Sequence, residues 1–277
     1  MFKDKTITIF GGSGSIGMLI AKTLKHYKPH SIRIFSNDEN SLWKAQQALN
    51  DNIQYRYILG DIREYRIVKR ALRAVDYAFN CAAIKHVPIA EYNPIEAVQT
   101  NINGLDNIIE GCIAQNVPYL LHISTDKVVQ PLNIMGATKM IDEQIIRMRF
   151  QQNPQINMNC IRLGNVWGSR GSIVPIIEKC MKERKAIPLT DERMERYFVK
   201  PEELAYYIIT VVKMMEGGKI YVPKLKSYKI IDIIHEIAGK NYPIEIIGKR
   251  SGEKLKEKLL SEKELRNAIE LEDMWVI

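Results

Sequence analysis

The chain has 277 residues, 46% hydrophobic and 26% charged, which is long enough for one large α/β domain with a smaller lobe. No segment is apolar over the length of a membrane span, and the first residues lack the apolar core of a signal peptide, so we expect a cytoplasmic protein without membrane contact. The net charge of +8 is dispersed among acidic residues without any nucleic-acid-binding signature, which argues against a nucleic-acid partner and suits anionic small molecules.

Short runs of β-branched and aromatic residues alternate with helix-period segments through the first part of the chain. This alternation is typical of βαβ units, which predict a parallel sheet with helices on both faces, the Rossmann-type doubly wound α/β fold. Strands are expected at 6–10, 31–35, 57–59, 77–79 and 120–123. Helices are expected at 14–27, from the end of the second strand through 49, at 68–73 and at 95–115.

The pattern changes after Arg162. Glycine and serine cluster in 164–172, shorter mixed elements follow, and the tail 254–277 is charged and helical in character. We therefore predict a cofactor-binding domain over 1–162, to which the chain returns near 195–222. A smaller C-terminal substrate-binding lobe is expected over 163–277.

A glycine-rich loop follows the first strand and opens the first helix. Gly11, Gly14 and Gly17 permit a tight turn and a close backbone approach, and the start of the helix offers free N–H groups and a positive dipole end to a pyrophosphate. In this strand–turn–helix context, dinucleotide binding is favoured over an ordinary turn. The expected cofactor contacts are Gly11, Ser13, Gly14, Ser15, Ile16 and Gly17.

The end of the second strand bears on the choice of cofactor. An NAD enzyme usually carries an acid there to bond the ribose 2′-hydroxyl. Ser36 and Asn37 remove the charge that would repel a 2′-phosphate, which favours NADP over NAD, although 36–39 could also simply cap the next helix. Asp61 and Ile62, after the third strand, are placed to bond the adenine edge; the alternative is a strand-ending turn.

The strongest chemical signal is Ser124-Thr125-Asp126-Lys127, at the carboxyl end of the fifth strand. Open α/β sheets bind their ligands at this edge. An aspartate and a lysine facing a cofactor there predict acid–base chemistry. The alternative is a solvated surface ion pair.

Several segments in order through nearly the whole chain carry a resemblance to a known family: 82–94, 100–104, 124–127, 162–172, 194–197 and 250–255. In them the sequence resembles the extended short-chain dehydrogenases/reductases, and among these the soluble UDP-N-acetylglucosamine 4,6-dehydratases (inverting type) of the polysaccharide biosynthesis protein family. The resemblance implies NADP as cofactor and a UDP-N-acetylhexosamine as substrate. No metal is expected, because the cysteines are far apart and form no Cys-x-x-Cys pair.

The family's reaction has a physical reason, because the C5 proton of a hexose is barely acidic until C4 is a carbonyl. C4 is therefore oxidised first, the C5 proton is removed, water leaves from C6, and hydride returns at C6. The resemblance implies that Asp126 handles the proton of the departing C6 hydroxyl and that Lys127 is the base toward C5. Thr125, with Ser124 as the nearest substitute, would bond the C4 oxygen.

One position departs from the superfamily pattern. Met135 stands where the superfamily has its catalytic tyrosine, four residues before Lys139, the lysine implied to bond the nicotinamide ribose. Methionine cannot accept the C4 hydroxyl proton, so this step falls to Asp126, Thr125 or a water. Some dehydratases of this group also carry methionine there, so the resemblance stands.

The resemblance also implies contacts outside the fifth strand. Arginine suits the diphosphate of a UDP-sugar because its planar fork pairs bidentately. Lys85 would face the sugar and the cofactor, with a solvated lysine as the alternative. The remaining implied cofactor contacts are Ala82, Ala83 and Asn101, and the implied substrate contacts are Asn165, Arg196, Arg250 and Glu253.

Two other functions stay open. The chain could make or consume a UDP-sugar 5,6-ene in the same pathway, an alternative that Met135 and the compact length leave open. It could also be a non-catalytic NADP-binding sensor, although the retained lysines at the site oppose this. By analogy with the superfamily, helices 95–115 and 134–150 would pair across a dimer contact, so we predict a homo-oligomer. The C5 stereochemistry and the nucleotide stay undetermined.

Overall fold

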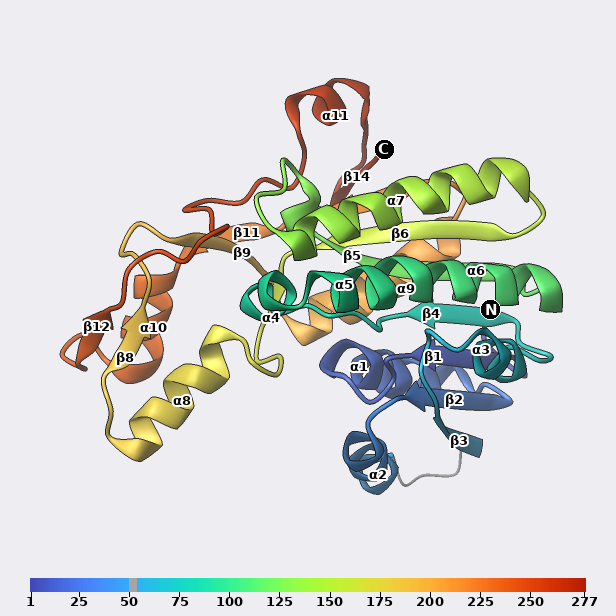
Figure 1. The fold of residues 1–277 in the computed structure, drawn as a ribbon, viewed down its shortest axis with the longest axis horizontal. Helices are drawn as coiled ribbons and strands as arrows, with labels where there is room; N and C mark the ends of the chain where they lie inside the picture. The colour runs from blue at the N-terminus through green and yellow to red at the C-terminus, as the bar shows by residue number, and fades with distance from the viewer. Residues whose placement is uncertain (50–53) are drawn as a thin grey trace.

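The computed structural model describes residues 1–49 and 54–277, and its centre is a nine-stranded sheet in the order β13-β14-β10-β6-β5-β4-β1-β2-β3 (Figure 1). The six strands β1 to β6 pair in parallel in the order β3-β2-β1-β4-β5-β6, which is the order of a Rossmann sheet and confirms the predicted fold class. These strands are β1 (Thr6–Phe10), β2 (Ser31–Ser36), β3 (Gln54–Leu59), β4 (Tyr77–Asn80), β5 (Tyr119–Thr125) and β6 (Asn157–Leu163).

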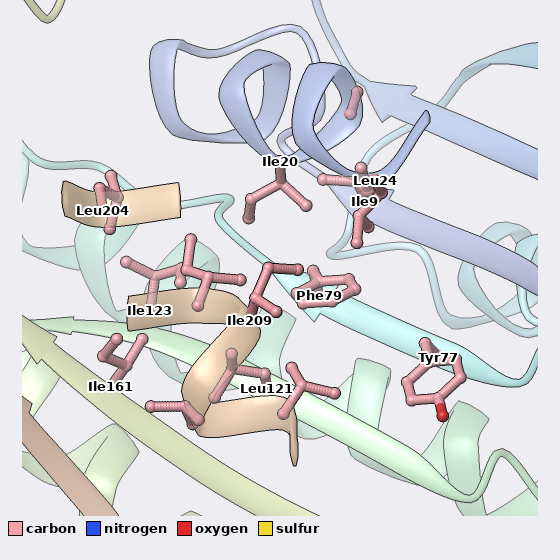
Figure 2. Packing of buried hydrophobic residues seen from close by; sticks show 14 of the residues in the cluster. Ile9, Ile20, Leu24, Tyr77, Phe79, Leu121, Ile123, Ile161, Leu204 and Ile209 are labelled. Atoms are coloured by element: carbon pink, nitrogen blue, oxygen red, sulfur yellow. The ribbon is translucent and has the colours of Figure 1, made fainter. Parts of the chain in front are cut away.

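Helices cover both faces of the sheet because successive strand residues point to opposite sides. Ile9 packs in a cluster with α1, α2 and α9, whereas Phe10 packs with α3, α6 and α7. Figure 2 shows the first of these clusters, where Ile20 of α1 and Leu204 of α9 line the same apolar layer. The helices are α1 (Ser15–Leu24), α2 (Glu39–Ala48), α3 (Tyr65–Ala71), α6 (Gly104–Gln115), α7 (Ile134–Gln152) and α9 (Pro201–Met214).

Short helical segments join these layers. The helix expected over 95–115 is interrupted by a π-helical stretch, and short turns follow α1, β4 and β5. None of the helices within 1–49 and 54–277 is long and apolar enough to cross a membrane. The segments are η1 (Lys25–Tyr27), α4 (Val87–Tyr92), α5 (Pro94–Ala97), the π-helix η2 (Val98–Asn103) and η3 (Asp126–Val128).

A smaller lobe projects beyond the carboxyl ends of the strands, at the left of Figure 1. It has a core of its own, in which Ile177, Ile187, Phe198 and Ile233 are buried together. One small sheet consists of β11, β9 and β7, and a second of β12 and β8. Its elements are β7 (Asn165–Val166), α8 (Ile173–Glu183), β8 (Ile187–Leu189), β9 (Glu195–Val199), β11 (Lys226–Lys229), α10 (Ile230–Ala238) and β12 (Ile244–Ile246).

The chain returns to the large sheet after this lobe. β10 (Ile220–Pro223) pairs with β6, and β14 (Met274–Val276) then pairs antiparallel with β10 and with β13 (Ile269–Glu270). The helical character expected for the tail 254–277 was wrong, because its only helix in the structure is the short α11 (Glu262–Asn267). The charges around α11 suggested a longer helix, but Met274 and Val276 alternate inward as in a strand.

Candidate functional site

The glycine loop lies where the strand order reverses, between the carboxyl ends of β1 and β4. Gly11 has a φ of +69°, and a Cβ there would lie 2.7 Å from the backbone nitrogen of Ala82. A Cβ on Gly17 would lie 2.5 Å from the carbonyl oxygen of Gly11. Gly14 is the N-cap of α1 and offers no capping side chain. The loop is therefore a backbone cradle at a helix N-terminus, which fits a dinucleotide pyrophosphate.

The residues after β2 lie against this cradle. Ser13 Oγ is 2.8 Å from Ser36 Oγ, which also accepts from the backbone nitrogen of Asp38 at 3.2 Å. The capping alternative applies to Asp38, whose carboxylate accepts from the backbone nitrogen and hydroxyl of Ser41. The hydroxyl of Ser36 thus faces the phosphate loop, while its neighbour Asp38 holds the helix.

Asp61, expected at the adenine edge, accepts hydrogen bonds from two side chains, those of Arg63 and Asn37. Burial tends to raise the pKa of its carboxyl, but hydrogen bonds from Arg63 and Asn37 outweigh burial and lower that pKa. Ile62 is buried, and a Cβ on Gly104 of α6 would lie 2.5 Å from its Cδ1. The structure brings Asn37 and Asp61 together, whereas the side chain of Ile62 belongs to the core.

The segment after β4 carries Ala82, Ala83 and Lys85. Asn101 fixes it, because its amide accepts from the Ile84 nitrogen at 2.8 Å and donates to the Ile84 oxygen and to Thr138 Oγ1. Asn101 is 2% exposed, so it supports this segment from the protein interior. Lys85 Nζ donates to the carbonyl oxygen of Arg170 at 2.7 Å, and partial burial with the nearby charge of Arg170 lowers the pKa of Lys85.

The predicted acid–base couple lies at the carboxyl end of β5. Asp126 is fully buried, and its Oδ1 accepts from Lys127 Nζ at 2.9 Å and from Thr125 Oγ1 at 3.1 Å. Its Oδ2 is also buried and has no hydrogen-bond partner within the described residues. Lys127 Nζ is 3.5 Å from Asn165 Oδ1 on β7. Four of the predicted site residues thus meet between the sheet and the smaller lobe.

Lys139 belongs to a second, buried group. Its Nζ lies 2.6 Å from His122 Nε2 and 3.0 Å from Asp142 Oδ2. Burial, followed by the charge of Lys139, lowers the pKa of His122 to about 4 against the opposing effect of Asp142. The sequence analysis missed His122 and Asp142. The available signals were a histidine inside an apolar strand and an aspartate three residues after Lys139.

Met135 and Ser124 each contact residues other than the acid–base couple. Met135 is 4% exposed and packs in an apolar cluster with Ala90 and Ala97. Ser124 Oγ donates to Glu143 Oε1 at 2.6 Å, and Glu143 forms a buried ion pair with Arg162. Ser124 therefore supports the ion pair behind β5, so the structure does not favour it as a substitute for Thr125.

The predicted substrate contacts of the lobe form a separate group. Arg196 Nη2 is 3.5 Å from Glu253 Oε1, and Glu253 Oε2 accepts from the backbone nitrogen of Arg250 at 3.2 Å. Arg196 is nearly buried, whereas Arg250 is exposed. The structure thus brings these three residues together.

Two contacts tie this group to the segment that follows Lys127. Asn133 Nδ2 donates to the Gly252 oxygen at 2.9 Å, and Lys254 Nζ donates to the Val129 oxygen at 2.7 Å. Asn133 also accepts from the Gly136 nitrogen as the N-cap of α7. The loop that carries the predicted substrate contacts and the segment after Lys127 are therefore held together by residues more than a hundred positions apart in sequence.

Comparison with known proteins assigns the chain to a family. The family model described as "Polysaccharide biosynthesis protein" matches residues 7–277. The chain belongs to this family. It is 39% identical over 281 residues to the UDP-N-acetylglucosamine 4,6-dehydratase (inverting) of Campylobacter jejuni, covering 100% of this chain and 84% of the relative. It is 34% identical over 286 residues to a UDP-glucose 4-epimerase of Rickettsia conorii, with the same two shares covered.

Solved structures agree with the family. Pen from Bacillus thuringiensis has a TM-score of 0.94 and 37% identity, covering 100% of this chain and 88% of that one. DesIV, the dTDP-glucose 4,6-dehydratase of Streptomyces venezuelae, solved with NAD and TYD bound, has a TM-score of 0.84 and 19% identity over 94% and 90% of the two chains, which shows the fold alone. These findings confirm that the chain is an enzyme of the extended short-chain dehydrogenase/reductase type.

Proposed function

We propose that the protein is a cytoplasmic, NADP-dependent 4,6-dehydratase that converts UDP-N-acetylglucosamine into a 4-keto-6-deoxy UDP-N-acetylhexosamine, with inversion at C5. The product would serve surface glycan or pseudaminic-type nonulosonate synthesis. The observation that carries the proposal is the Asp126–Lys127 couple at the ligand-binding edge of the sheet, where the lysine is partly exposed. The named activity of the Campylobacter jejuni relative supports the substrate.

The couple has the right proton count for this elimination. Once Asp126 has taken the C4 hydroxyl proton and Lys127 has released its own proton to solvent, a neutral amine lies 2.9 Å from a carboxylic acid. Lys127 can then take the C5 proton while Asp126 gives its proton to the departing C6 hydroxyl, and the original ion pair is restored. A bound nicotinamide supplies the hydride acceptor for C4 and the hydride donor for C6.

The first step needs an acceptor for the C4 hydroxyl proton, because Met135 has no acidic group. We assign this role to Thr125 and Asp126, whose oxygens are 3.1 Å apart. Thr125 would bond the C4 oxygen and Asp126 Oδ1 would receive the proton through it. Asn165, Arg196, Arg250 and Glu253 would hold the UDP portion of the substrate.

The experiment is incubation of the NADP-loaded protein with UDP-N-acetylglucosamine in D₂O. The expected product has lost the C6 hydroxyl and carries deuterium at C5, as seen by NMR. Lys127→Ala should abolish the reaction, and Lys44→Ala, a change of an exposed lysine on α2, should leave it unchanged. If the folded, NADP-loaded protein leaves the sugar unchanged, the proposal is rejected. A sugar changed only at C4 would indicate an epimerase.

A second candidate keeps the same chemistry but ends or begins at a UDP-sugar 5,6-ene. The buried Met135 favours it, since the site lacks the superfamily's tyrosine to exchange protons during completion of the reaction. The alkene and the ketone are isomers, so mass alone does not separate them and the NMR spectrum decides. A sensor without catalysis would bind NADP and leave every UDP-sugar unchanged in both the parent protein and Lys127→Ala.

We further propose that the protein is a homo-oligomer, at least a dimer. Apolar side chains are exposed along two neighbouring helical segments, and exposed apolar side chains that lie close together often mark an interface. Light scattering should give at least twice the monomer mass, and a monomer would refute this proposal. The exposed residues are Ile95 and Val98 before α6, and Met140, Ile141 and Met148 on α7.

A further inference from the structure

Arg170 reaches from the loop after β7 onto the phosphate loop of the sheet. Its Nη2 donates to the Ser13 carbonyl oxygen at 2.6 Å and its Nη1 to Ser41 Oγ at 3.1 Å. Its backbone nitrogen donates to Ser15 Oγ at 3.0 Å, at the first residue of α1. One arginine of the smaller lobe thus spans the start of α1 and the start of α2.

The segment around Arg170 is built to hold this position. Lys85 Nζ donates to its carbonyl oxygen at 2.7 Å. Gly171 follows with a φ of +71°, and a Cβ there would lie 2.5 Å from His86 Cε1, so the turn requires glycine. The arginine is therefore directed toward the sheet by contacts on both sides of it.

The surroundings of the guanidinium suit an anion. Its Nη1 donates to the Ser41 hydroxyl, the hydroxyl of the contacted Ser13 donates to that of Ser36, and within residues 1–49 and 54–277 no ion pair involves Arg170. The carboxylate of Asp38 has both oxygens engaged by Ser41; these bonds, and to a smaller extent the charge of Arg170, lower the pKa of Asp38. A guanidinium with only neutral partners is a strong phosphate donor.

The position of this group relative to β2 identifies the phosphate. In a Rossmann fold the end of the second strand faces the 2′ position of the adenosine ribose. Ser36 ends β2 here, and the neighbouring Asn37 carries no positive charge. A 2′-phosphate bound to this cradle would meet Ser13, Ser36 and Ser41, with Arg170 as the one cation among these groups.

We propose that Arg170 recognises the 2′-phosphate of NADP, supplying from the smaller lobe the charge that position 37 lacks. The inference rests on the proposed nicotinamide nucleotide but not on the sugar reaction. The planar guanidinium of Arg170 would pair with two phosphate oxygens, and the serine hydroxyls would bond the third. The same contact links the substrate lobe to the cofactor, so NADP would fix the lobe against the sheet more firmly than NAD.

The test measures binding without any sugar, by calorimetry with NADP⁺, NAD⁺, adenosine 2′,5′-bisphosphate and AMP. Arg170→Ala should weaken NADP⁺ and the bisphosphate by about 10- to 100-fold, as loss of a charged hydrogen-bond pair predicts. NAD⁺ and AMP should change by less than roughly threefold, since they lack the phosphate. Arg193→Ala, a change of an exposed arginine of the same lobe, is the matched control.

A rescue separates recognition from folding. Asn37→Arg placed in the Arg170→Ala protein should restore the preference for the 2′-phosphate, and Arg170→Lys should retain part of it as a point charge. Equal weakening of NADP⁺ and NAD⁺, or no change in either, would overturn the assignment, as would a parent protein without preference for the bisphosphate over AMP. A protein that passes these binding tests but leaves UDP-N-acetylglucosamine unchanged refutes the dehydratase alone.

Discussion

Two lysine–aspartate pairs lie near the carboxyl end of β5, and they differ in what surrounds them. Lys127 Nζ is 2.9 Å from Asp126, and Lys139 Nζ is 3.0 Å from Asp142. The side chain of Lys127 is 17% exposed and faces Asn165 of the smaller lobe. Lys139 is 5% exposed and also contacts His122 inside the sheet layer.

The comparison teaches that access, rather than pairing distance, separates the two roles. The partly exposed Lys127 can exchange protons with a bound sugar, while Asp126 is fully buried beside it. A closed pair with a neutral histidine beside it cannot exchange protons with the sugar, but it fixes Lys139 and the start of α7. The open pair should therefore govern turnover, and the closed pair should govern stability.

The largest expected effect is on turnover in the open pair. Lys127→Met should lower the rate of dehydration by about 10²- to 10⁴-fold, because it removes the proposed general base. Calorimetry should give unchanged affinity for NADP⁺, which would show that the cofactor site of the variant is still folded. A variant that dehydrates the sugar at the parent rate would refute the role of Lys127.

The closed pair should respond in stability. Asp142→Asn should lower the free energy of unfolding by about 3–5 kcal/mol, because it leaves the ammonium of Lys139 buried without a countercharge. Urea unfolding measures this loss. Adding Lys139→Met to Asp142→Asn should recover most of the stability, since a buried charge is then no longer unpaired. A double variant as unstable as the single one would contradict the explanation.

The histidine beside the closed pair predicts a pH dependence. The pKa of His122 is about 4 in the folded protein and 6.5 ordinarily, so the unfolded chain gains a proton at a higher pH than the folded one. Stability should therefore fall as the pH falls from 6.5 to 4, by about 3 kcal/mol in total from this group. His122→Gln should show a shallower fall in urea unfolding at matched pH values. Parallel curves for the two proteins would refute this origin.

Local patterns explain which parts could be predicted from the sequence. The glycine loop and the segment after β5 each hold their functional residues within a few positions, at strand ends where the fold itself places ligands. The Rossmann sheet followed from the same alternation of strands and helices. The tail was misjudged because a strand of three residues, Met274–Val276, leaves almost no periodic signal.

The contacts that complete the site depend on residues far apart in sequence. Arg170 and Ser15 are 155 positions apart, and Asn133 and Gly252 are 119 apart. No spacing rule links such residues, because the distance between them is set by how the lobe docks on the sheet. His122 was equally hidden, since a histidine in a buried strand can be an ordinary core residue until its neighbours on α7 are known.

The smallest expected effect separates two adjacent hydroxyls on β5. Thr125 donates to Asp126 in the open pair, whereas Ser124 donates to the buried Glu143 on the other side of the strand. Thr125→Val should therefore lower dehydration by roughly tenfold, the size expected for one net hydrogen bond, without an equal loss of stability. Thr125→Ser should recover the rate, because it restores the hydroxyl.

Ser124→Ala should show the opposite profile. It leaves Glu143 with one fewer donor and should cost about 1–3 kcal/mol in urea unfolding, with little change in dehydration by the folded protein. Strand residues alternate between faces, so neighbouring hydroxyls can serve different sides of the same sheet. If Thr125→Val and Ser124→Ala lowered turnover and stability alike, the two adjacent hydroxyls would not have separate roles. That result would contradict the division between an open catalytic pair and a closed structural pair.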